Sequence, residues 1–317
     1  MKEVSKLLRK VVKLQKEEKL IPPNRSLLVA FSGGVDSVCL SDALLELRSF
    51  LKLKRVALAH FNHRLREEAD QEEEFCRSYA KERGLEIFVG SEEVSMIAER
   101  TGKNLEETAR ELRYSFLREV KEREGFDLIA TAHHLNDLVE TALIWLSRGA
   151  GLEGLIGFEP KEGDIVRPLY EATREEILSY ARTRGLKWVE DTSNRDPRFF
   201  RNRVRMEVIP VLKSINPNLE ETFLRTRKIL KDENELMEKL SEETLKVVLR
   251  GNCVEVKGLS EAHIAIQRRA LMKFTGVRNF SKIEQLRRLL GRGGEVSLGE
   301  NLKAIRKGKL LCLKKKE

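Results

Sequence analysis

A short polar segment with the sequence SGGVDS, Ser32 to Ser37, follows the five apolar residues Leu27 to Phe31. The residues after it read as a helix, so the segment joins a buried strand to a helix N-terminus. Such a junction binds anions, because the first N–H groups of a helix have no partner within it and the helix dipole is positive there. Glycines let the backbone turn sharply and approach a ligand, and the serines add hydroxyl donors. We therefore predict a phosphate site made by Ser32, Gly33, Gly34, Val35, Asp36 and Ser37.

Asp36 is the exceptional member of this segment, since a carboxylate repels a phosphate. Its presence is explained if a metal ion lies between the two groups. The segment lacks both the Gly-Lys-Ser/Thr ending of the common phosphate loop and the three spaced glycines of dinucleotide-binding folds. The alternative interpretation is an ordinary strand-to-helix turn capped by a serine.

A second polar segment begins at His133, after another apolar stretch, and a helix is predicted from Leu135 to Ser147. On a helix, His133, Asp137 and Glu140 would share a face, because they are spaced four and three residues apart. Asp137 and Asp36 could together hold Mg²⁺, which commonly takes one or two carboxylates and fills its other positions with phosphates and water. His133 could contact a phosphate or accept a proton. The alternative is a helix cap with a satisfied histidine.

A predicted helix from Asn104 to Glu124 carries Arg110 and Arg113 on the side of Glu107. Arginine stabilises charge that develops on a phosphoryl group, so both residues are candidates for contacting a nucleotide. The spacing alone is equally compatible with a solvated helix face that carries Glu–Arg pairs.

A third stretch, from Asn194 to Arg205, interleaves arginines with Phe199 and Phe200. Basic and aromatic side chains in this pattern can pair with phosphates and stack on an unpaired base. Its arginines are Arg195, Arg198, Arg201, Arg203 and Arg205. The alternative is a basic loop with a purely structural role.

Strands and helices alternate in the first two thirds of the chain, which predicts a doubly wound, mostly parallel α/β sheet of the Rossmann-like kind. Ligands bind such sheets beyond the carboxyl ends of the strands. The phosphate segment, the stretch His60 to Arg66 with its second histidine His63, and the segment at His133 all follow predicted strands. We expect these groups to meet in one active site.

Pro210 and Pro217 suggest a domain boundary, which predicts a catalytic domain at 1–215 and a smaller α+β domain at 216–317. Charge supports two different roles. Residues 213–317 contain 24 basic and 14 acidic residues, whereas residues 1–212 contain 36 and 37. An excess of positive charge confined to one part indicates a polyanionic partner, most simply a nucleic acid, although a solvated basic face would have the same composition.

The four cysteines, Cys39, Cys76, Cys253 and Cys312, form no close sequence pair. We therefore expect reduced core residues, as in a cytoplasmic protein. The N-terminal residues carry charges throughout, unlike a signal peptide, and no apolar run has the length needed to span a membrane.

Several segments resemble those of the tRNA(Ile)-lysidine synthetases, a family of the PP-loop ATP pyrophosphatase superfamily. In chain order, the segments are SGGVDS, HFNHRLR, the residues from Asn104 to Tyr114, HHLNDLVET, RPL and DTSNRDPRFFRNRVR. Other members of the superfamily share SGGVDS, whereas the last three segments are more specific to this family.

The resemblance implies a ligase that uses ATP and Mg²⁺ to join free L-lysine to the wobble cytidine of a tRNA(Ile) with a CAU anticodon, forming a carbon–nitrogen bond. It implies catalytic roles for Asp36, Asp137, Arg113 and His133, nucleotide contacts by the phosphate segment, His60, His63 and Arg110, and lysine or tRNA contacts by Glu140, Asn194, Arg201 and Arg205. Longer members of the family have a further C-terminal domain, so anticodon-stem contacts are expected from residues 217–317. A homodimer is compatible with the resemblance.

Three alternatives differ in chemistry. A tRNA thiolation enzyme of the same superfamily would need a cysteine pair or an iron–sulfur cluster, and the sequence has no Cys-x-x-Cys. A small-molecule synthetase that acts on NAD or GMP precursors would not need the basic C-terminal part. A non-enzymatic RNA-binding protein would leave Asp36 and Asp137 without a role.

Overall fold

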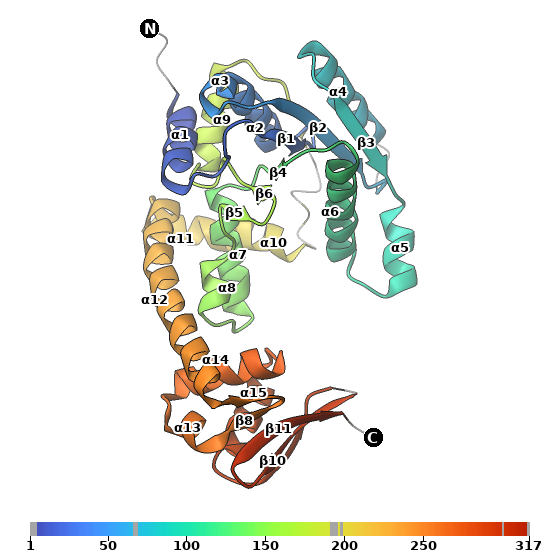
Figure 1. Cartoon of the computed structure of the whole chain (residues 1–317). Helices are drawn as coiled ribbons and strands as arrows, with labels where there is room; N and C mark the ends of the chain where they lie inside the picture. Colours follow the sequence, from blue (N-terminus) through green and yellow to red (C-terminus); the bar gives the residue numbers. More distant parts are fainter. Residues whose placement is uncertain (1–4, 66–68, 191–195, 197–198, 300, 316–317) are drawn as a thin grey trace. The chain divides into compact units, whose positions relative to one another are not determined.

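The computed structural model describes residues 5–65, 69–190, 196, 199–299 and 301–315. It divides into two compact units, Met1–Thr226 and Arg227–Glu317, which we call the N-terminal unit and the C-terminal unit (Figure 1). The division lies inside helix α12 (Leu219–Val248), because the first turn of that helix is anchored on the N-terminal unit, where Glu220 accepts a hydrogen bond from Asn136. Of the residues named above, Arg66, Asn194, Arg195 and Arg198 lie outside the described ranges.

The N-terminal unit is built on a sheet of strand order β3-β2-β1-β4-β6-β5 (Figure 1). Adjacent strands from β3 to β6 run parallel, and only β5 is antiparallel to its neighbour β6. The predicted doubly wound, mostly parallel sheet is therefore confirmed. The strands are β1 (Ser26–Ala30), β2 (Arg55–Asn62), β3 (Ile87–Ser91), β4 (Leu128–Ala130), β5 (Lys161–Glu162) and β6 (Ile165–Val166).

Strand β1 is apolar throughout because both of its faces are covered. Leu27 and Val29 belong to the core on one face, and Leu28 belongs to the core on the other face. The first core is formed with α1 (Lys6–Glu18), α2 (Val35–Glu46), α4 (Ala69–Glu82) and α9 (Arg174–Thr183), and the second with α6 (Leu105–Arg123). Burial on both sides explains a strand in which no polar residue alternates with the apolar ones.

The helices begin at residues suited to cap them. The Asn104 side chain accepts hydrogen bonds from two N–H groups of α6, and Thr173 with Glu176 forms a capping box at α9. Helix α7 (Leu135–Ser147) has the predicted bounds. The remaining helices of this unit are α3 (Arg48–Leu51), α5 (Val94–Thr101), α8 (Leu152–Ile156), α10 (Phe200–Arg203), the π-helical turn η2 (Val204–Val208) and α11 (Ile209–Ile215).

Among the described residues, no helix is long and apolar enough to cross a membrane.

Asp127 ties the start of β4 to the start of β1. Its Oδ2 accepts hydrogen bonds from the Ser26 N–H (2.8 Å) and hydroxyl (2.6 Å), and its Oδ1 pairs with Arg25 (2.7 Å). These contacts lower the pKa of Asp127 from 3.8 to about 2, chiefly through the hydrogen bonds from Ser26.

We expect Asp127→Asn to lower the free energy of unfolding at neutral pH by about 1–2 kcal/mol, a value reduced because the side chain is 30% exposed. Because the folded pKa is depressed, the stabilisation is present above pH 4 and is lost as the pH falls towards 2. Urea unfolding of wild type and variant at neutral pH and at pH 3 measures this. If the free energies of unfolding of wild type and variant differed as much at pH 3 as at neutral pH, the expectation would be contradicted.

The C-terminal unit contains an antiparallel sheet of order β7-β8-β11-β10-β9, packed with helices around its own core. The predicted smaller α+β domain is thus confirmed as a fold. Strand β10 was not predicted, because only Ala304 in its sequence LKAIRK is buried and the pattern reads as polar. The elements after α12 are β7 (Leu249–Arg250), β8 (Cys253–Glu255), α13 (Val256–Glu261), α14 (Ile264–Thr275), α15 (Phe280–Leu289), β9 (Gly294–Ser297), β10 (Leu302–Lys307) and β11 (Leu310–Lys315).

The prediction of four reduced cysteines was wrong for two of them. Cys253 and Cys312 are directly paired across β8 and β11 and form a disulfide. Cys39 and Cys76 are buried thiols, as expected. The disulfide was missed because the two cysteines are 59 residues apart and only the strand register brings them together.

We expect reduction, or Cys312→Ser, to lower the stability of the C-terminal unit by about 2–4 kcal/mol, since the crosslink closes a long loop. Calorimetry with and without dithiothreitol measures this, and Cys39→Ser is the control that should keep the response to reductant. An identical melting temperature for oxidised and reduced protein would refute the expectation.

Candidate functional site

The turn between β1 and α2 has the shape that the SGGVDS sequence predicts. Gly33 has a φ of +81°, and a Cβ at this position would lie 3.1 Å from both the Cys76 Sγ and the Phe75 ring. A side chain here would be strained by the backbone conformation and crowded by these two neighbours. The Gly33 carbonyl also accepts a hydrogen bond from the Val189 N–H, which fixes the turn against a distant segment.

Serine hydroxyls hold this turn in place. Ser37 Oγ donates to the Gly34 carbonyl (2.9 Å), and the Ser32 N–H donates to Ser37 Oγ (3.2 Å). In the described part of the chain, the N–H groups of Val35, Asp36 and Ser37 at the start of α2 have no acceptor. This arrangement can bind an anion, because preoriented N–H groups at a helix N-terminus favour negative charge.

Two of the predicted carboxylates, from Asp36 and Asp137, lie near the same nitrogen of one imidazole. His134 Nε2 is 3.8 Å from Asp36 Oδ1 and 3.5 Å from Asp137 Oδ2. Asp36 also pairs with the Arg174 guanidinium (3.1 Å). The backbone N–H of His134 donates a hydrogen bond to Asp137 Oδ2 (2.9 Å). Strand ends β1 and β4 thus bring Asp36 and Asp137 together, as the topology predicted.

The charges in this group support one another. Burial opposes ionisation of both carboxylates, but His134 and the arginines outweigh it, so the pKa values of Asp36 and Asp137 lie below their ordinary values. Burial likewise opposes the charging of His134, yet Asp137 and Asp36 raise its pKa. Sequence reasoning selected His133 and missed both His134 and Arg174. The signal for His134 was its place three residues before Asp137, at the N-cap of α7.

His133 lies in a different environment from its neighbour. Its Nδ1 is 2.9 Å from the Thr131 hydroxyl, and its ring contacts Phe158 edge-on. Burial, aided by nearby arginines that include Arg113, lowers the pKa of His133 to about 3. The imidazole is therefore neutral at physiological pH, which suits a hydrogen-bonding contact better than proton acceptance.

Glu140 is buried, with 1% of its surface exposed, and its carboxylate is paired with two arginines. Arg201 Nε donates to Glu140 Oε2 (2.9 Å), while Arg205 donates to both oxygens at 2.6 and 3.0 Å. Both arginines also lie about 4 Å from Asp137 Oδ1. The structure therefore brings Glu140, Arg201 and Arg205 together beside Asp137, and contact of Glu140 with lysine stays a prediction.

His63 follows β2, as predicted, whereas His60 lies within that strand and is directed into the protein. Its Nδ1 is 3.0 Å from the Phe31 carbonyl and 3.3 Å from Cys76 Sγ, and burial lowers its pKa. It thus supports the chain directly before the SGGVDS turn. The His63 ring packs edge-on against Phe61. A nucleotide contact by either histidine remains a prediction.

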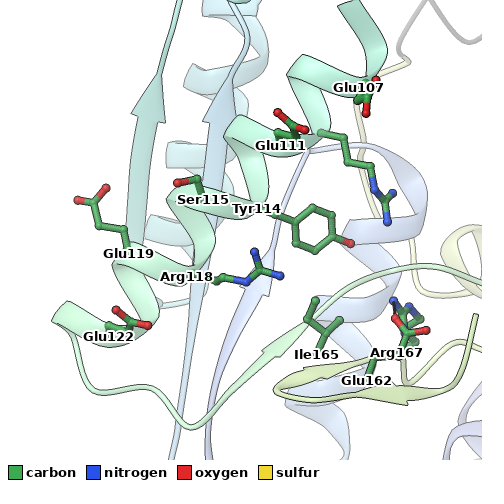
Figure 2. A pocket seen from close by; sticks show the side chains of 11 residues that line it. Glu107, Glu111, Tyr114, Ser115, Arg118, Glu119, Glu122, Glu162, Ile165 and Arg167 are labelled. Atoms are coloured by element: carbon green, nitrogen blue, oxygen red, sulfur yellow. Dashed lines mark hydrogen bonds and ion pairs between the residues drawn. The ribbon is translucent and has the colours of Figure 1, made fainter. Parts of the chain in front are cut away.

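Helix α6 lines one side of a pocket of about 850 Å³ with Tyr114, two arginines (Arg110 and Arg118) and several glutamates (Figure 2). Arg113 lies beside Tyr114 but is not among the residues that line the pocket. The guanidinium carbons of Arg110, Arg113 and Arg118 lie 4.9, 5.6 and 5.9 Å from the centroid of the Tyr114 ring. Arg167, on the far wall with the β5–β6 hairpin, also lines the pocket.

Arg113 is the arginine of this helix best placed for an anion. Burial and the charges of Arg110 and Arg201 lower its pKa, and it pairs with no carboxylate among the described residues. Arg113 is half-buried, and such a cation among other cations is stabilised when an anion binds beside it. The geometry therefore supports the predicted contact of Arg113 with a phosphate.

Two family models and several known proteins match this chain. A PP-loop domain matches residues 3–212, and a TilS-like substrate binding domain matches residues 248–313. The tRNA(Ile)-lysidine synthase of Persephonella marina is 40% identical over 266 residues, which cover 84% of this chain and 58% of that protein. The enzyme of the same name from Caldanaerobacter subterraneus subsp. tengcongensis is 30% identical over 98% of this chain and 70% of its own length.

The chain spans about half the length of several other relatives that carry this name. The U34-tRNA thiolase NcsA from Methanococcus maripaludis, a protein with a [4Fe-4S] cluster, superposes with a TM-score of 0.57 at 19% identity, covering 71% of this chain and 78% of the thiolase. That likeness concerns the fold alone. The SGGVDS turn, the paired carboxylates and both matched domains place the chain in the tRNA(Ile)-lysidine synthase family.

Proposed function

We propose that this protein uses ATP to join free L-lysine to the wobble cytidine of a tRNA(Ile) with a CAU anticodon, releasing AMP and pyrophosphate. The observation that carries the proposal is the pair Asp36 and Asp137, joined through His134 beside a turn with unpaired N–H groups. A small-molecule synthetase would share this site, but family membership and the basic C-terminal unit favour a tRNA substrate.

In the first step, the cytidine 2-oxo oxygen attacks the α-phosphorus of ATP, and pyrophosphate leaves. The N–H groups of Val35, Asp36 and Ser37 would bind phosphate oxygens, and Arg113 would stabilise the charge that develops on the transferred group. This step requires no protein nucleophile. The thiols of Cys39 and Cys76 agree with this, because burial raises the pKa of each to about 12.

Asp36 and Asp137 fit a magnesium ion by their chemistry. Both are carboxylates held ionised, and both are close to the anion-binding turn. No cluster of three or more candidate ligands occurs in the described ranges, so phosphate and water oxygens would complete the coordination. When bound, Mg²⁺ would neutralise phosphate charge and polarise the phosphoryl group.

In the second step, the amine of lysine attacks C2 of the activated cytidine, and AMP leaves. Contact of the cationic lysine with Asp137 or Glu140 stays a prediction, because the arginines already pair with Glu140 and Asp137 is also the proposed magnesium ligand. Arg201, Arg205 and Asn194 would then position the tRNA near the reacting base.

The C-terminal unit would supply most of the contacts to tRNA phosphates. Its basic excess suits sequence-independent positioning, while base selection would belong to the Asn194–Arg205 stretch. We further infer a cytoplasmic enzyme, since its proposed substrates are ATP and tRNA, while a homodimer stays a prediction.

The thiolation alternative is not supported by the cysteines. An iron–sulfur cluster is held by thiolates, but Cys39 and Cys76 are buried and Cys253 is bonded to Cys312. All four cysteines of the chain are accounted for in this way.

Transfer of radiolabelled lysine to tRNA transcripts tests the proposed function. We expect ATP-dependent incorporation into a transcript with a CAU anticodon and none when the wobble cytidine is replaced by uridine. Equal labelling of both transcripts, or labelling without ATP, would exclude the proposed reaction.

A further inference from the structure

Two of the large aromatic side chains that are exposed on the N-terminal unit lie beside the same arginine, although such side chains are usually buried. Trp145, in the last turn of α7, is 43% exposed, and Phe200, the first residue of α10, is 40% exposed. The guanidinium carbon of Arg148 lies 5.8 Å from the centroid of the Trp145 ring and 5.7 Å from that of the Phe200 ring. We call these three residues the aromatic platform.

Arg148 has its charge available for a ligand. Its side chain is exposed and forms no ion pair with any residue in the described part of the chain. A cation held against two aromatic rings, with no carboxylate beside it, complements a ligand that carries both a flat ring and a negative charge. A nucleotide is such a ligand, since bases stack on aromatic rings and on guanidinium planes.

The platform is connected to the candidate active site by the two helices that carry it. Helix α7 has Asp137 in its first turn and Trp145 eight residues later, a separation of about 12 Å along the axis at 1.5 Å per residue. Phe200 directly precedes Arg201, which donates to Glu140. A few nucleotides of a single strand span this distance, because even stacked nucleotides advance by about 3.4 Å each.

We propose that the aromatic platform binds an unpaired base of the RNA, a few nucleotides from the base that is modified, by stacking on Trp145 and Phe200 while Arg148 approaches the phosphate. This rests on the proposed function for its substrate. It adds a binding site outside the catalytic group and predicts that the RNA enters along α7. Because every base has a flat face, the contact would add affinity without selecting a sequence.

The kinetic test compares ring removal with a matched control. Trp145→Ala and Phe200→Ala should each raise the KM for tRNA about tenfold, while the KM for ATP stays unchanged. Trp145→Phe should keep most of the affinity, since it retains a ring. Leu146→Ala is the control, because Leu146 is 58% exposed beside Trp145 but has no ring to stack. If Trp145→Ala leaves the KM for tRNA unchanged, or Leu146→Ala raises it equally, the platform is not a base site.

A binding test does not depend on the reaction. The chain has two tryptophans, and Trp188 packs against the core, so Trp188→Phe leaves Trp145 as the only tryptophan, which can be excited selectively at wavelengths that the tyrosines do not absorb. Titration with a short oligocytidylate should quench Trp145, and an abasic oligonucleotide of equal length should not. This result would support the platform even if lysine transfer failed.

Equal quenching by the abasic oligonucleotide would overturn the proposal, because it would show that the backbone alone is bound. It would also be overturned if Trp145→Ala changed the sedimentation coefficient of the protein while oligocytidylate left the fluorescence unaltered. In that case a second copy of the chain would cover the platform.

Discussion

Asp36→Asn should reduce tRNA-dependent formation of AMP by more than about a hundredfold while the protein stays folded, and Asp137→Asn should do the same. Each change removes a negative charge from the pair joined through His134 without removing bulk. Asp36 is partly exposed, so its replacement should cost little stability. The measurement is the rate of AMP release at saturating ATP and Mg²⁺, with the melting temperature recorded in parallel.

Asp42→Asn is the matched control for this experiment. Asp42 lies in the same helix as Asp36, but its carboxylate accepts hydrogen bonds from the Tyr180 hydroxyl (2.7 Å) and from Arg184 (3.0 Å). Its replacement should lower the melting temperature and leave the turnover number nearly unchanged. If Asp36→Asn or Asp137→Asn kept near-normal turnover, the two-carboxylate account would fail.

Glu140→Gln should destabilise the N-terminal unit by about 3–5 kcal/mol, which lowers its melting temperature by roughly 10 °C. The change leaves the charges of Arg201 and Arg205 without their buried carboxylate. It also loosens the segment proposed to position the tRNA, so the KM for tRNA should rise. Thermal unfolding and steady-state kinetics measure the two effects.

Glu207→Gln provides the comparison, since Glu207 is 52% exposed and pairs with Arg203 on the surface of the same segment (3.2 Å). An exposed pair of this kind contributes at most about 1 kcal/mol. If Glu140→Gln instead kept the wild-type melting temperature and raised the KM for lysine far more than the KM for ATP, the result would favour direct recognition of lysine by Glu140.

The parts of the fold that were predictable are those encoded by neighbouring residues. The bounds of α7 were foreseen because a long apolar pattern starts at a polar cap. The turn at Gly33 was foreseen because few residue types tolerate its geometry. Strands β5 and β6 were missed because two residues are too few to show a periodic pattern.

Sequence reasoning selected some of the residues that gather at this site, but not their pairings. Asp36 and Asp137 could be placed together because both follow strands of one parallel sheet. The contact of Asp36 with Arg174 joins residues 138 apart, and no local pattern signals it. Adjacent histidines could not be ranked either, since only the packed structure shows that His134 lies near both carboxylates. The pairing of Glu140 with two arginines was hidden for the same reason.

Mass analysis of nucleosides tests the central claim most directly. The full chain would be incubated with a tRNA(Ile) transcript, ATP, Mg²⁺ and lysine, and the tRNA would then be digested to nucleosides. We expect one cytidine per tRNA to be replaced by a nucleoside whose mass corresponds to cytidine joined to lysine with loss of water. The new nucleoside should be absent with Asp36→Asn. Unchanged cytidine with the active wild-type protein, or a product that contains sulfur, would contradict the account.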